Sequence, residues 1–295
     1  MAKIQETTLA NWTKPPSNNE EAKLKNAEKL VKDAIKADPK LSKMEIDIFG
    51  QGSYENNTNV RLNSDIDINV MYTSGFYFDL PSGKTREDYG LTNPSKYSFS
   101  EFKDDVETAL RNKFKADVKR ENKCIEILEN TTRIQTDVVP TWKHKQYYET
   151  GDPVIGCQFR PDNGNWITNY PKQHIENGIA KNKRTSRRYK SLIRIHKKLR
   201  YSMIDQGIDI DDSIKSFLLE CLVWNCPDSI FNNAASWTDM LKSSIIHLHK
   251  QTKQDQTCKD WVEVSERLYL IRPSRKWTRE GINQYLSQIW NYLEF

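Results

Sequence analysis

Two aspartates on one face of a strand constrain the fold of this chain more than any other feature. Over Ser64–Val70 the side chains alternate, and one side of the strand carries the apolar residues Ile66 and Ile68. The opposite side carries Asp65 and Asp67. This pattern predicts a strand with one face in a hydrophobic core and an acidic face outside it, and therefore a sheet covered by other elements.

The surrounding sequence in the first half predicts helices and further strands. Helices are expected over Asn19–Asp38, which is amphipathic and ends before Pro39, and from Ser98, where Ser98 and Glu101 form a capping box. The stretch Thr73–Tyr97 has no clear period, so we expect a long surface connection there. The remaining strands are expected at Glu45–Phe49, Lys123–Leu128 and Arg133–Val139, the last two as a β-hairpin.

The second half of the chain has a helical pattern. Gly and Pro gather near residues 145–170, so we place a domain boundary there, with a mixed sheet domain at 1–160 and a helical domain at 161–295. The predicted fold class is α/β, of the α+β kind. The helices are expected at 185–206, 212–225, 237–250 and 279–293.

Composition excludes several classes of protein. With 37% hydrophobic and 29% charged residues, the chain has the composition of a globular protein, and no apolar run approaches the about 20 residues of a membrane helix. The N-terminal residues have no apolar segment, so we expect no secretory signal, no membrane partner and a cytoplasmic location. The cysteines are odd in number and lack metal-site spacing, which predicts reduced thiols.

Basic residues are concentrated in one segment. Residues 151–295 contain 22 Lys and Arg against 16 Asp and Glu, and Lys181–Arg200 contains ten basic residues and no acidic one. Such a run either binds phosphate groups or forms a solvated helix face. Lys190, Arg194 and Lys197 share a helix face that we expect to meet phosphate. His196 lies on the adjoining apolar face, where we expect a hydrogen-bonded core histidine.

Three carboxylates point to a metal site. Asp65 and Asp67 are like charges held together, and their hard oxygen atoms suit Mg²⁺ that carries nucleotide phosphates. Asp137 lies in a later strand, which would bring it beside the pair as an antiparallel neighbour. Three such acids are able to hold the two metal ions used in nucleotidyl transfer, and Asp137 would also accept a hydroxyl proton. The alternative is that these acids are exposed to solvent on strand edges and ends.

A glycine-serine turn follows the first predicted strand. Gly52-Ser53 would direct backbone N–H groups and a hydroxyl toward a triphosphate, and glycine permits a close approach. Such dipeptides are common in turns. The combination with a D-x-D strand and a third aspartate is much more specific.

Several motifs resemble one known family. Phe49–Tyr54, together with Asn57–Arg61 and Ser64–Ile68, resembles the signature of polymerase-β-type nucleotidyltransferases and, more narrowly, of the bacterial CD-NTases, which are relatives of cyclic GMP-AMP synthase and oligoadenylate synthase. The resemblance to the clade E branch covers most of the chain, through segments Asn169–Gly178, Tyr189–Arg200 and Ser213–Pro227.

The resemblance implies a set of site residues. Gln51, Gly52 and Ser53 would bind the donor triphosphate, with further phosphate contacts from Lys197 and Ser216. Two Mg²⁺ ions, or Mn²⁺ in their place, would be bound by the three catalytic residues Asp65, Asp67 and Asp137.

The resemblance also implies an architecture and an activity. The expected fold is a two-lobed polymerase-β-like nucleotidyltransferase with a mixed palm sheet, a C-terminal helical lobe and nucleotides in the cleft between them. The expected enzyme joins two NTPs into a cyclic dinucleotide by two transfers, releasing pyrophosphate. Its product would activate a separate effector in anti-phage (CBASS) signalling. We expect a monomer and, since the zinc-binding insertion of the animal DNA sensor is absent, no requirement for DNA.

Two other functions stay open at this point. One is nucleotidyl addition to RNA or protein, which a basic helix would also serve. The other is a non-catalytic nucleotide-binding module, against which the clustered acids argue because without metal they repel phosphate. The bases, the 2′ or 3′ linkage, the trigger and the effector are not readable from the sequence, although we expect at least one purine.

Overall fold

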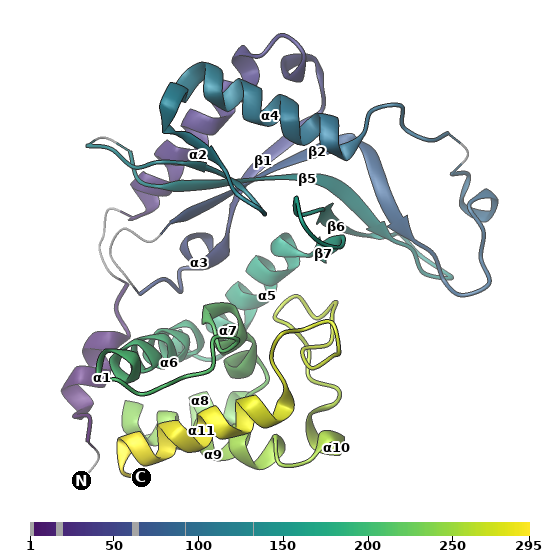
Figure 1. Cartoon of the computed structure of the whole chain (residues 1–295). Helices are drawn as coiled ribbons and strands as arrows, with labels where there is room; N and C mark the ends of the chain where they lie inside the picture. The colour runs from purple at the N-terminus through teal and green to yellow at the C-terminus, as the bar shows by residue number, and fades with distance from the viewer. Residues whose placement is uncertain (1–2, 16–19, 61–64, 92, 132) are drawn as a thin grey trace. The chain divides into compact units, whose positions relative to one another are not determined.

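The computed structural model describes residues 3–15, 20–60, 65–91, 93–131 and 133–295 (Figure 1). The chain forms two compact units. We call Ser17–Glu55 with Leu62–Pro171 the sheet unit, and Met1–Pro16 with Asn56–Arg61 and Lys172–Phe295 the helical unit. The division after Pro171 falls later than the expected boundary at residue 160, and a short segment before the acidic strand joins the helical unit.

The sheet unit is built on one mixed sheet. Its strands run in the order β1-β2-β5-β4-β3, and β6 pairs with both β5 and β7. β2 and β5 are parallel, and the other pairs are antiparallel. Within the described residues the strands are β1 (Ile46–Gln51), β2 (Ile66–Asp79), β3 (Val118–Arg120), β4 (Ile125–Ile127), β5 (Thr136–Gln146), β6 (Val154–Phe159) and β7 (Ile167–Asn169).

The direction of β5 corrects one expectation. Asp137 was expected on an antiparallel neighbour of the acidic strand, but β5 is parallel to β2. The reason is the crossover between them, which passes through α4 (Phe99–Phe114) and so returns the chain to the same end of the sheet. The expected hairpin is confirmed by the antiparallel pairing of β4 with β5.

β2 is longer than its alternating segment predicts. The strand continues to Asp79 after an irregularity between Tyr72 and Phe76, so the expected connection from Thr73 is wrong in its first part. Aromatic packing explains the extension, because Trp142 of β5 lies against the rings of Tyr72 and Tyr77.

Two helices cover one face of this sheet (Figure 1). α2 (Glu20–Ala37) and α4 pack with the apolar face of β2, where Ile66 and Ile68 are fully buried in one core. Both helices were predicted, and the capping box of Ser98 and Glu101 is confirmed. The expected first residues Asn19 and Ser64 lie outside the described residues. The shorter helical segments of this unit are η1 (Leu41–Lys43), α3 (Gly52–Glu55), η2 (Glu87–Tyr89) and η3 (Lys115–Asp117).

The helical unit has its own core. α6 is its centre, with residues on several of its faces buried, and the core also takes in side chains of α1, α7, α9 and α11. The expected helix at 185–206 begins later, because Ser186 and Arg187 adopt left-handed backbone and separate two helices. The helices are α1 (Glu6–Trp12), α5 (Pro171–Arg184), α6 (Arg188–Asp205), α7 (Ser216–Trp224), α8 (Asp228–Asn232), α9 (Trp237–Gln251), α10 (Asp255–Cys258) and α11 (Arg279–Leu293).

The structure bears on two features of the sequence, membrane helices and the state of the cysteines. In that part of the chain no helix has the length and apolar character to cross a membrane. All five cysteines are free thiols, as their number and spacing predicted.

Candidate active site

The acidic residues form a row across the sheet. Asp67 on β2 is in register with Gln51 of β1 on one side and with Asp137 of β5 on the other. Residues paired in this way project from the same face of a sheet. Asp65 lies just before β2, two residues from Asp67 on the same side of the chain. The structure therefore brings together the three acids singled out in the sequence.

The electrostatics show that these carboxylates repel one another. Burial, together with the charges of Asp137 and Asp65, raises the pKa of Asp67 to about 7. Burial, with a contribution from Asp65, raises the pKa of Asp137 to about 6. Burial and the neighbouring Asp137 also raise the pKa of the Cys124 thiol to about 12, so the thiol adds no further negative charge. An arrangement of this kind is stabilised by a cation.

The donor set fits Mg²⁺, although it is not a closed metal site. Across the described residues, no three or more His, Cys, Asp or Glu side chains are grouped as a ready metal-binding cluster. The charges of Asp65 and Asp137 nonetheless raise the pKa of Asp67, and the charge of Asp65 raises that of Asp137, so the three acids are neighbours. Their oxygen atoms are the hard ligands that Mg²⁺ prefers. These three residues would hold the ion, with phosphate oxygens completing its coordination.

The Gly52-Ser53 turn lies directly against the acids. Gly52 has a left-handed φ of 71° and begins α3. A Cβ atom added at Gly52 would lie 2.1 Å from Oδ2 of Asp67. Only glycine therefore allows the turn and the carboxylate to be this close, which agrees with the close approach expected from the sequence.

A pocket of about 220 Å³ opens beside the acidic row. Its wall includes Asp67, Asp137 and the exposed Lys123 of the β3–β4 turn. Cys157 of β6 and Asn169 of β7, which are in register with each other, also line it. Apart from the two acids, these residues were not singled out in the sequence.

A buried chain of hydrogen bonds lies at the floor of this pocket. Thr141 Oγ1 donates to Asn69 Oδ1 over 2.7 Å, and Asn69 Nδ2 donates to Gln51 Oε1 over 3.1 Å. Asn69 and Thr141 are fully buried. Because the carbonyl of Gln51 accepts from Asn69, its NH₂ group is the end left to meet a ligand. The strand period places Asn69, two residues after Asp67, on the same face of β2, but it does not identify Gln51 and Thr141 as its partners.

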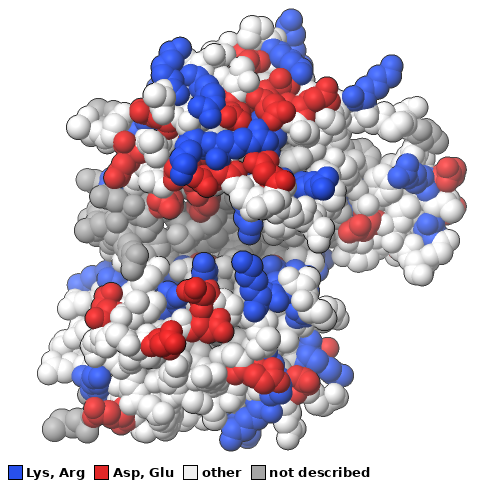
Figure 2. Space-filling model, in the orientation of Figure 1, with Lys and Arg blue, Asp and Glu red and all other residues white. Residues whose placement is uncertain are grey.

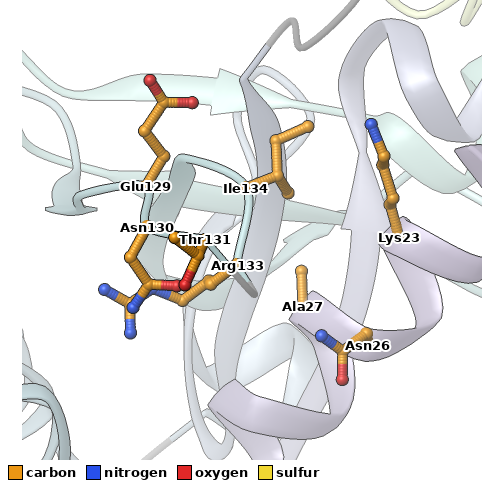
Figure 3. Close-up of a pocket in the computed structure, with 8 residues that line it drawn as sticks. All are labelled: Lys23, Asn26, Ala27, Glu129, Asn130, Thr131, Arg133 and Ile134. Carbon is orange, nitrogen blue, oxygen red and sulfur yellow. The ribbon is translucent and has the colours of Figure 1, made fainter.

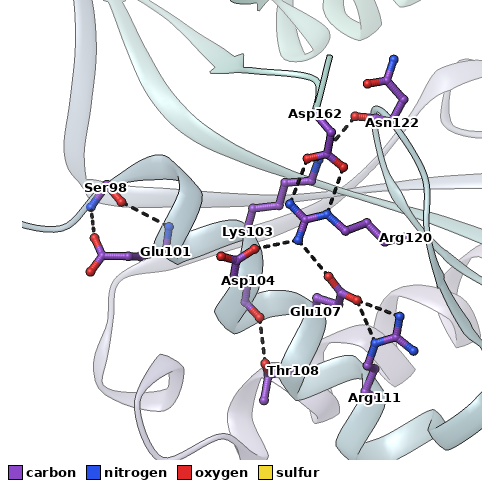
Figure 4. Close-up of polar contacts among 10 residues, drawn as sticks. All are labelled: Ser98, Glu101, Lys103, Asp104, Glu107, Thr108, Arg111, Arg120, Asn122 and Asp162. Atoms are coloured by element: carbon purple, nitrogen blue, oxygen red, sulfur yellow. Dashed lines mark hydrogen bonds and ion pairs between the residues drawn. The ribbon is translucent and has the colours of Figure 1, made fainter. Parts of the chain in front are cut away.

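A network of ion pairs supports the turn that carries Lys123 and Cys124 (Figure 4). Lys103 of α4 is buried, and its Nζ donates to Asp162 over 2.8 Å and to the carbonyl of Asn122 over 3.3 Å. Asp162 also accepts two hydrogen bonds from Arg120, which lower the pKa of its carboxyl to about 2. The network therefore fixes Asn122, next to the pocket-lining residues.

A second pocket, of about 290 Å³, lies between α2 and the connection from β4 to β5 (Figure 3). Lys23 and Asn26 reach it from α2, and Glu129, Asn130 and Arg133 line the other side. Arg133 is already paired with Asp117 and with the carbonyl of Leu128. None of the three aspartates lines this pocket, so we do not assign the reaction to it.

Lys197 and Ser216 lie in the helical unit. Lys197 is 2% exposed, and its Nζ donates to Glu220 Oε1 over 2.5 Å, to the carbonyl of Thr58 over 3.0 Å and to Thr58 Oγ1 over 3.2 Å. A phosphate contact from Lys197 would require these bonds to break. Ser216 is half-buried and begins α7, and its phosphate contact stays a prediction.

Lys190 and Arg194, on the same helix face as Lys197, are also buried, so the alternative of a solvated helix face does not hold for these residues, and their contact with phosphate stays a prediction. Lys190 is 9% exposed and Arg194 7%. Arg194 donates to the carbonyls of Thr13 and Asn57, and Lys181 donates to those of Trp224 and Cys226. Elsewhere, on the face in Figure 2, Lys and Arg are interspersed with Asp and Glu.

The expected role of His196 is confirmed. Its Nε2 lies 3.1 Å from Ser244 Oγ, and burial lowers the pKa of His196 to about 4. The ring is a hydrogen-bonded core histidine.

Comparisons with known proteins agree with this geometry. The family model described as the cGAS/DncV-like nucleotidyltransferase C-terminal helical domain matches residues 176–294. The chain is 58% identical to the cyclic dipyrimidine nucleotide synthase CdnE of Cecembia lonarensis, covering 100% of both chains. It is 36% identical to the cyclic dipurine nucleotide synthase of Elizabethkingia meningoseptica, covering 99% of both.

Two solved structures resemble the whole chain. The structure of the Elizabethkingia meningoseptica CdnE cyclic dinucleotide synthase with GTP and Apcpp has a TM-score of 0.82 at 34% identity, over 99% of this chain and 100% of that one. The structure of the Rhodothermus marinus CdnE c-UMP-AMP synthase with Apcpp and Upnpp has a TM-score of 0.83 at 29% identity, over 98% and 97%. These likenesses support the two-lobed nucleotidyltransferase fold expected from the sequence.

Proposed function

The chain belongs to the CdnE branch of the CD-NTases, the cyclic dinucleotide synthases, and on this premise we propose that it joins two pyrimidine nucleoside triphosphates into a ring with release of pyrophosphate. Its synthesis of a cyclic dinucleotide from NTPs is supported by every relative named above. The choice of bases, the metal and the cellular role are the finer parts of the proposal.

The observation that carries the proposal is the register of Asp67 on β2 with Asp137 on β5, beside the Gly52-Ser53 turn. A divalent metal at the acids would neutralise the charge that develops on the reacting phosphate. The turn and the NH₂ group of Gln51 would bind and orient the triphosphate. Asp65, Asp67 and Asp137 would hold the metal at this position.

The reaction has two similar steps. In each, a ribose hydroxyl oxygen forms a bond to an α-phosphorus, and the bond from that phosphorus to the pyrophosphate leaving group breaks. Asp137 is our candidate for the residue that accepts the hydroxyl proton, because it lines the pocket beside Asp67, with which it is in register. The second step joins the remaining hydroxyl and triphosphate of the linear intermediate and closes the ring.

The pyrimidine assignment rests on relatedness. The relative that is 58% identical is named for dipyrimidine products, whereas the dipurine synthase is 36% identical. We therefore propose a cyclic dipyrimidine in place of the expected purine-containing product.

The biological role follows from the same family likeness. We propose that the protein acts in anti-phage CBASS signalling, where its product activates a separate effector protein. We further propose that two Mg²⁺ ions, or Mn²⁺ in their place, serve the reaction. Our expectation is a cytoplasmic monomer that needs no DNA.

Product analysis tests the proposal. The purified protein is incubated with Mg²⁺ and the four NTPs, singly and in pairs, and phosphatase-treated products are identified by mass spectrometry. We expect consumption of CTP or UTP and a phosphatase-resistant ring with two phosphates. Only linear, phosphatase-sensitive products would rule out ring closure, and transfer of label to RNA or protein would favour macromolecular addition.

A double variant tests the metal assignment. Asp65→Asn with Asp67→Asn should abolish synthesis, because neutral amides bind Mg²⁺ far more weakly than carboxylates. Asp79→Asn, at the far end of the same strand, is the control and should retain activity. Unchanged product formation in the double variant would refute the assignment.

A further inference from the structure

The helical unit carries a groove that the candidate active site does not use. α9 and α11 pack side by side in this unit (Figure 1). A hollow of about 520 Å³ opens between them and is lined by residues of both helices. Every residue that lines it belongs to the helical unit, and none is among those assigned above to metal or nucleotide binding.

The floor of the groove is apolar and partly exposed. α9 directs one stripe of side chains, which includes Ile245 and Leu248, into the core of the helical unit. Ile246 lies beside this stripe, is 47% exposed and lines the groove. On the α11 side the groove is lined by Leu286 and by the half-buried Trp290. The core of the unit therefore does not account for Ile246, which is left facing solvent.

Three lysines follow the same side of α9. Lys242 and Lys250 lie four residues before and four residues after Ile246, so the three share one helix face, and Lys253 comes just beyond the end of the helix. All three lysines are exposed. Lys250 and Lys253 line the groove, and the Nζ atom of Lys242 lies 5.4 Å from the ring centroid of Trp290. Positive charge thus flanks the exposed apolar floor.

The protein itself does not neutralise this charge. Among the described residues, the ion pairs of this region join Arg279 to Asp255 and to Glu280, and they leave Lys250 and Lys253 without an acidic partner. No Asp or Glu of the described part of the chain lines the groove. An acidic group from another molecule would therefore meet lysines that are not already paired.

The dimensions of the groove set the size of an occupant. Lys242 and Lys253 are separated by a helical distance of about 16 Å, which is about three turns of an α-helix. The α11 side of the groove presents the uncharged Ser287 and Asn291, so the cations lie on the α9 side alone. A complementary helix would have an apolar stripe and one acidic flank.

We propose that the groove between α9 and α11 docks an amphipathic helix of a partner protein, with apolar side chains against Ile246 and Trp290 and acidic side chains against the lysines of α9. Insertion into a lipid surface would need apolar side chains that protrude, whereas these line a hollow. A nucleic acid would need aromatic stacking platforms, whereas Ile246 and Leu286 are aliphatic. The proposal goes beyond the synthesis of a cyclic dinucleotide and depends only on residues of the helical unit.

Peptide binding tests the charge complementarity. Two fluorescent helical peptides carry the same leucine stripe, one with Glu and the other with Lys on its flanks, and their binding to the full-length protein is measured by fluorescence anisotropy at low salt. We expect the acidic peptide to bind about tenfold more tightly, the effect of about 1.4 kcal/mol. Equal affinities, or no binding of the acidic peptide, would overturn the proposal.

Variants of α9 test the location. Ile246→Glu should weaken binding of the acidic peptide about tenfold, and it should fold because lysines lie four residues away on both sides of the new carboxylate. Ile179→Glu is the matched control, because Ile179 is a 55% exposed isoleucine on α5 that does not line the groove. An equal loss in the control would refute the location.

Charge reversal gives an independent result. Lys250→Glu with Lys253→Glu should reverse the preference, so that the Lys-flanked peptide binds more tightly than the Glu-flanked one. An unchanged preference would refute the role of the lysines. Synthesis of the cyclic product should stay within twofold of the parent in these variants, and because peptide binding is measured without any reaction, its outcome does not depend on which product the enzyme makes.

Two other occupants would give different results. Dimerisation of the parent in analytical ultracentrifugation that Ile246→Glu abolishes would assign the groove to a second copy of this chain. Binding to phosphatidylserine vesicles that the same variant abolishes would assign it to a lipid surface. Either result would overturn the proposed partner helix.

Discussion

Replacement of Gly52 by alanine should inactivate the enzyme through a contact that the structure specifies. The new Cβ would lie 2.1 Å from Oδ2 and 2.9 Å from Cγ of Asp67. Carbon and oxygen atoms settle at about 3.3 Å or more, so the carboxylate would have to shift by about 1 Å. A shift of that size in a catalytic group lowers the rate on the order of 100-fold. The left-handed φ of 71° adds about 1–2 kcal/mol of destabilisation.

Gly207→Ala is the control that separates backbone strain from displacement of the Asp67 carboxylate. Gly207 has a φ of 78°, and a Cβ there would meet nothing within 4 Å. Both variants should lose about 1–2 kcal/mol in urea unfolding, but only Gly52→Ala should lose activity in the product assay. Parental activity in Gly52→Ala, or an equal loss in Gly207→Ala, would refute the argument that the turn must lie against Asp67.

Three further predictions concern other buried groups. Thr141→Val removes the hydroxyl that donates to Asn69, which in turn orients Gln51. The KM for the nucleotides should therefore rise about fivefold, the effect of about 1 kcal/mol, whereas Thr141→Ser should keep the KM of the parent. Equal KM values in the two variants would contradict this role. Burial lowers the pKa of His196 to about 4 in the folded protein. Below pH 6.5 the unfolded chain therefore binds more protons at this residue than the folded protein does. As the pH falls from 6.5 to 4, His196 should lower the free energy of unfolding by about 3 kcal/mol. Urea unfolding of His196→Gln should lack this decrement, and an identical pH profile would contradict it. Lys103→Met should lower the free energy of unfolding by about 2 kcal/mol, because it removes a buried partner of Asp162. Lys119→Met removes an exposed ion pair and should change the free energy of unfolding by less than about 0.5 kcal/mol. Equal losses in the two variants would contradict the importance of the buried pair.

Local patterns predicted most of the sheet unit. The alternation around Asp65 and Asp67 identified β2, and the capping box at Ser98 identified the start of α4. These signals are local, since they depend on the period of the backbone and on residues three or four positions apart. The pairing of Asp137 with Asp67 depends instead on the register between distant strands. The sequence placed the two acids in the same half of the chain but did not show that their strands are parallel.

The basic run shows what local patterns leave out. Its composition indicates phosphate binding, which stays a prediction, but it did not show that Arg194 and Lys197 donate to carbonyls of residues 13, 57 and 58. Such partners lie about 140 or more positions away, and helical periodicity has no information on them. One local signal was present, because Leu192, Ile193 and Ile195 place apolar groups on more than one face of α6. A helix of this kind is buried on several sides, and its cations then need internal partners.

The sequence predicted the acids of the candidate site but not the residues that hydrogen-bond around them. Asp65, Asp67, Asp137 and Gly52 carry recognisable chemistry in the sequence. Asn69 and Thr141 do not, because a buried amide or hydroxyl gains its role only from the neighbour that it meets in the fold.

Anomalous diffraction from crystals grown with Mn²⁺ and a non-hydrolysable pyrimidine triphosphate analogue would show whether the three aspartates bind metal together. We expect anomalous density contacted by carboxylate oxygens of Asp65, Asp67 and Asp137, with the triphosphate against the Gly52-Ser53 turn. Density elsewhere in the protein, or metal bound by the first two aspartates with Asp137 turned away, would contradict this expectation.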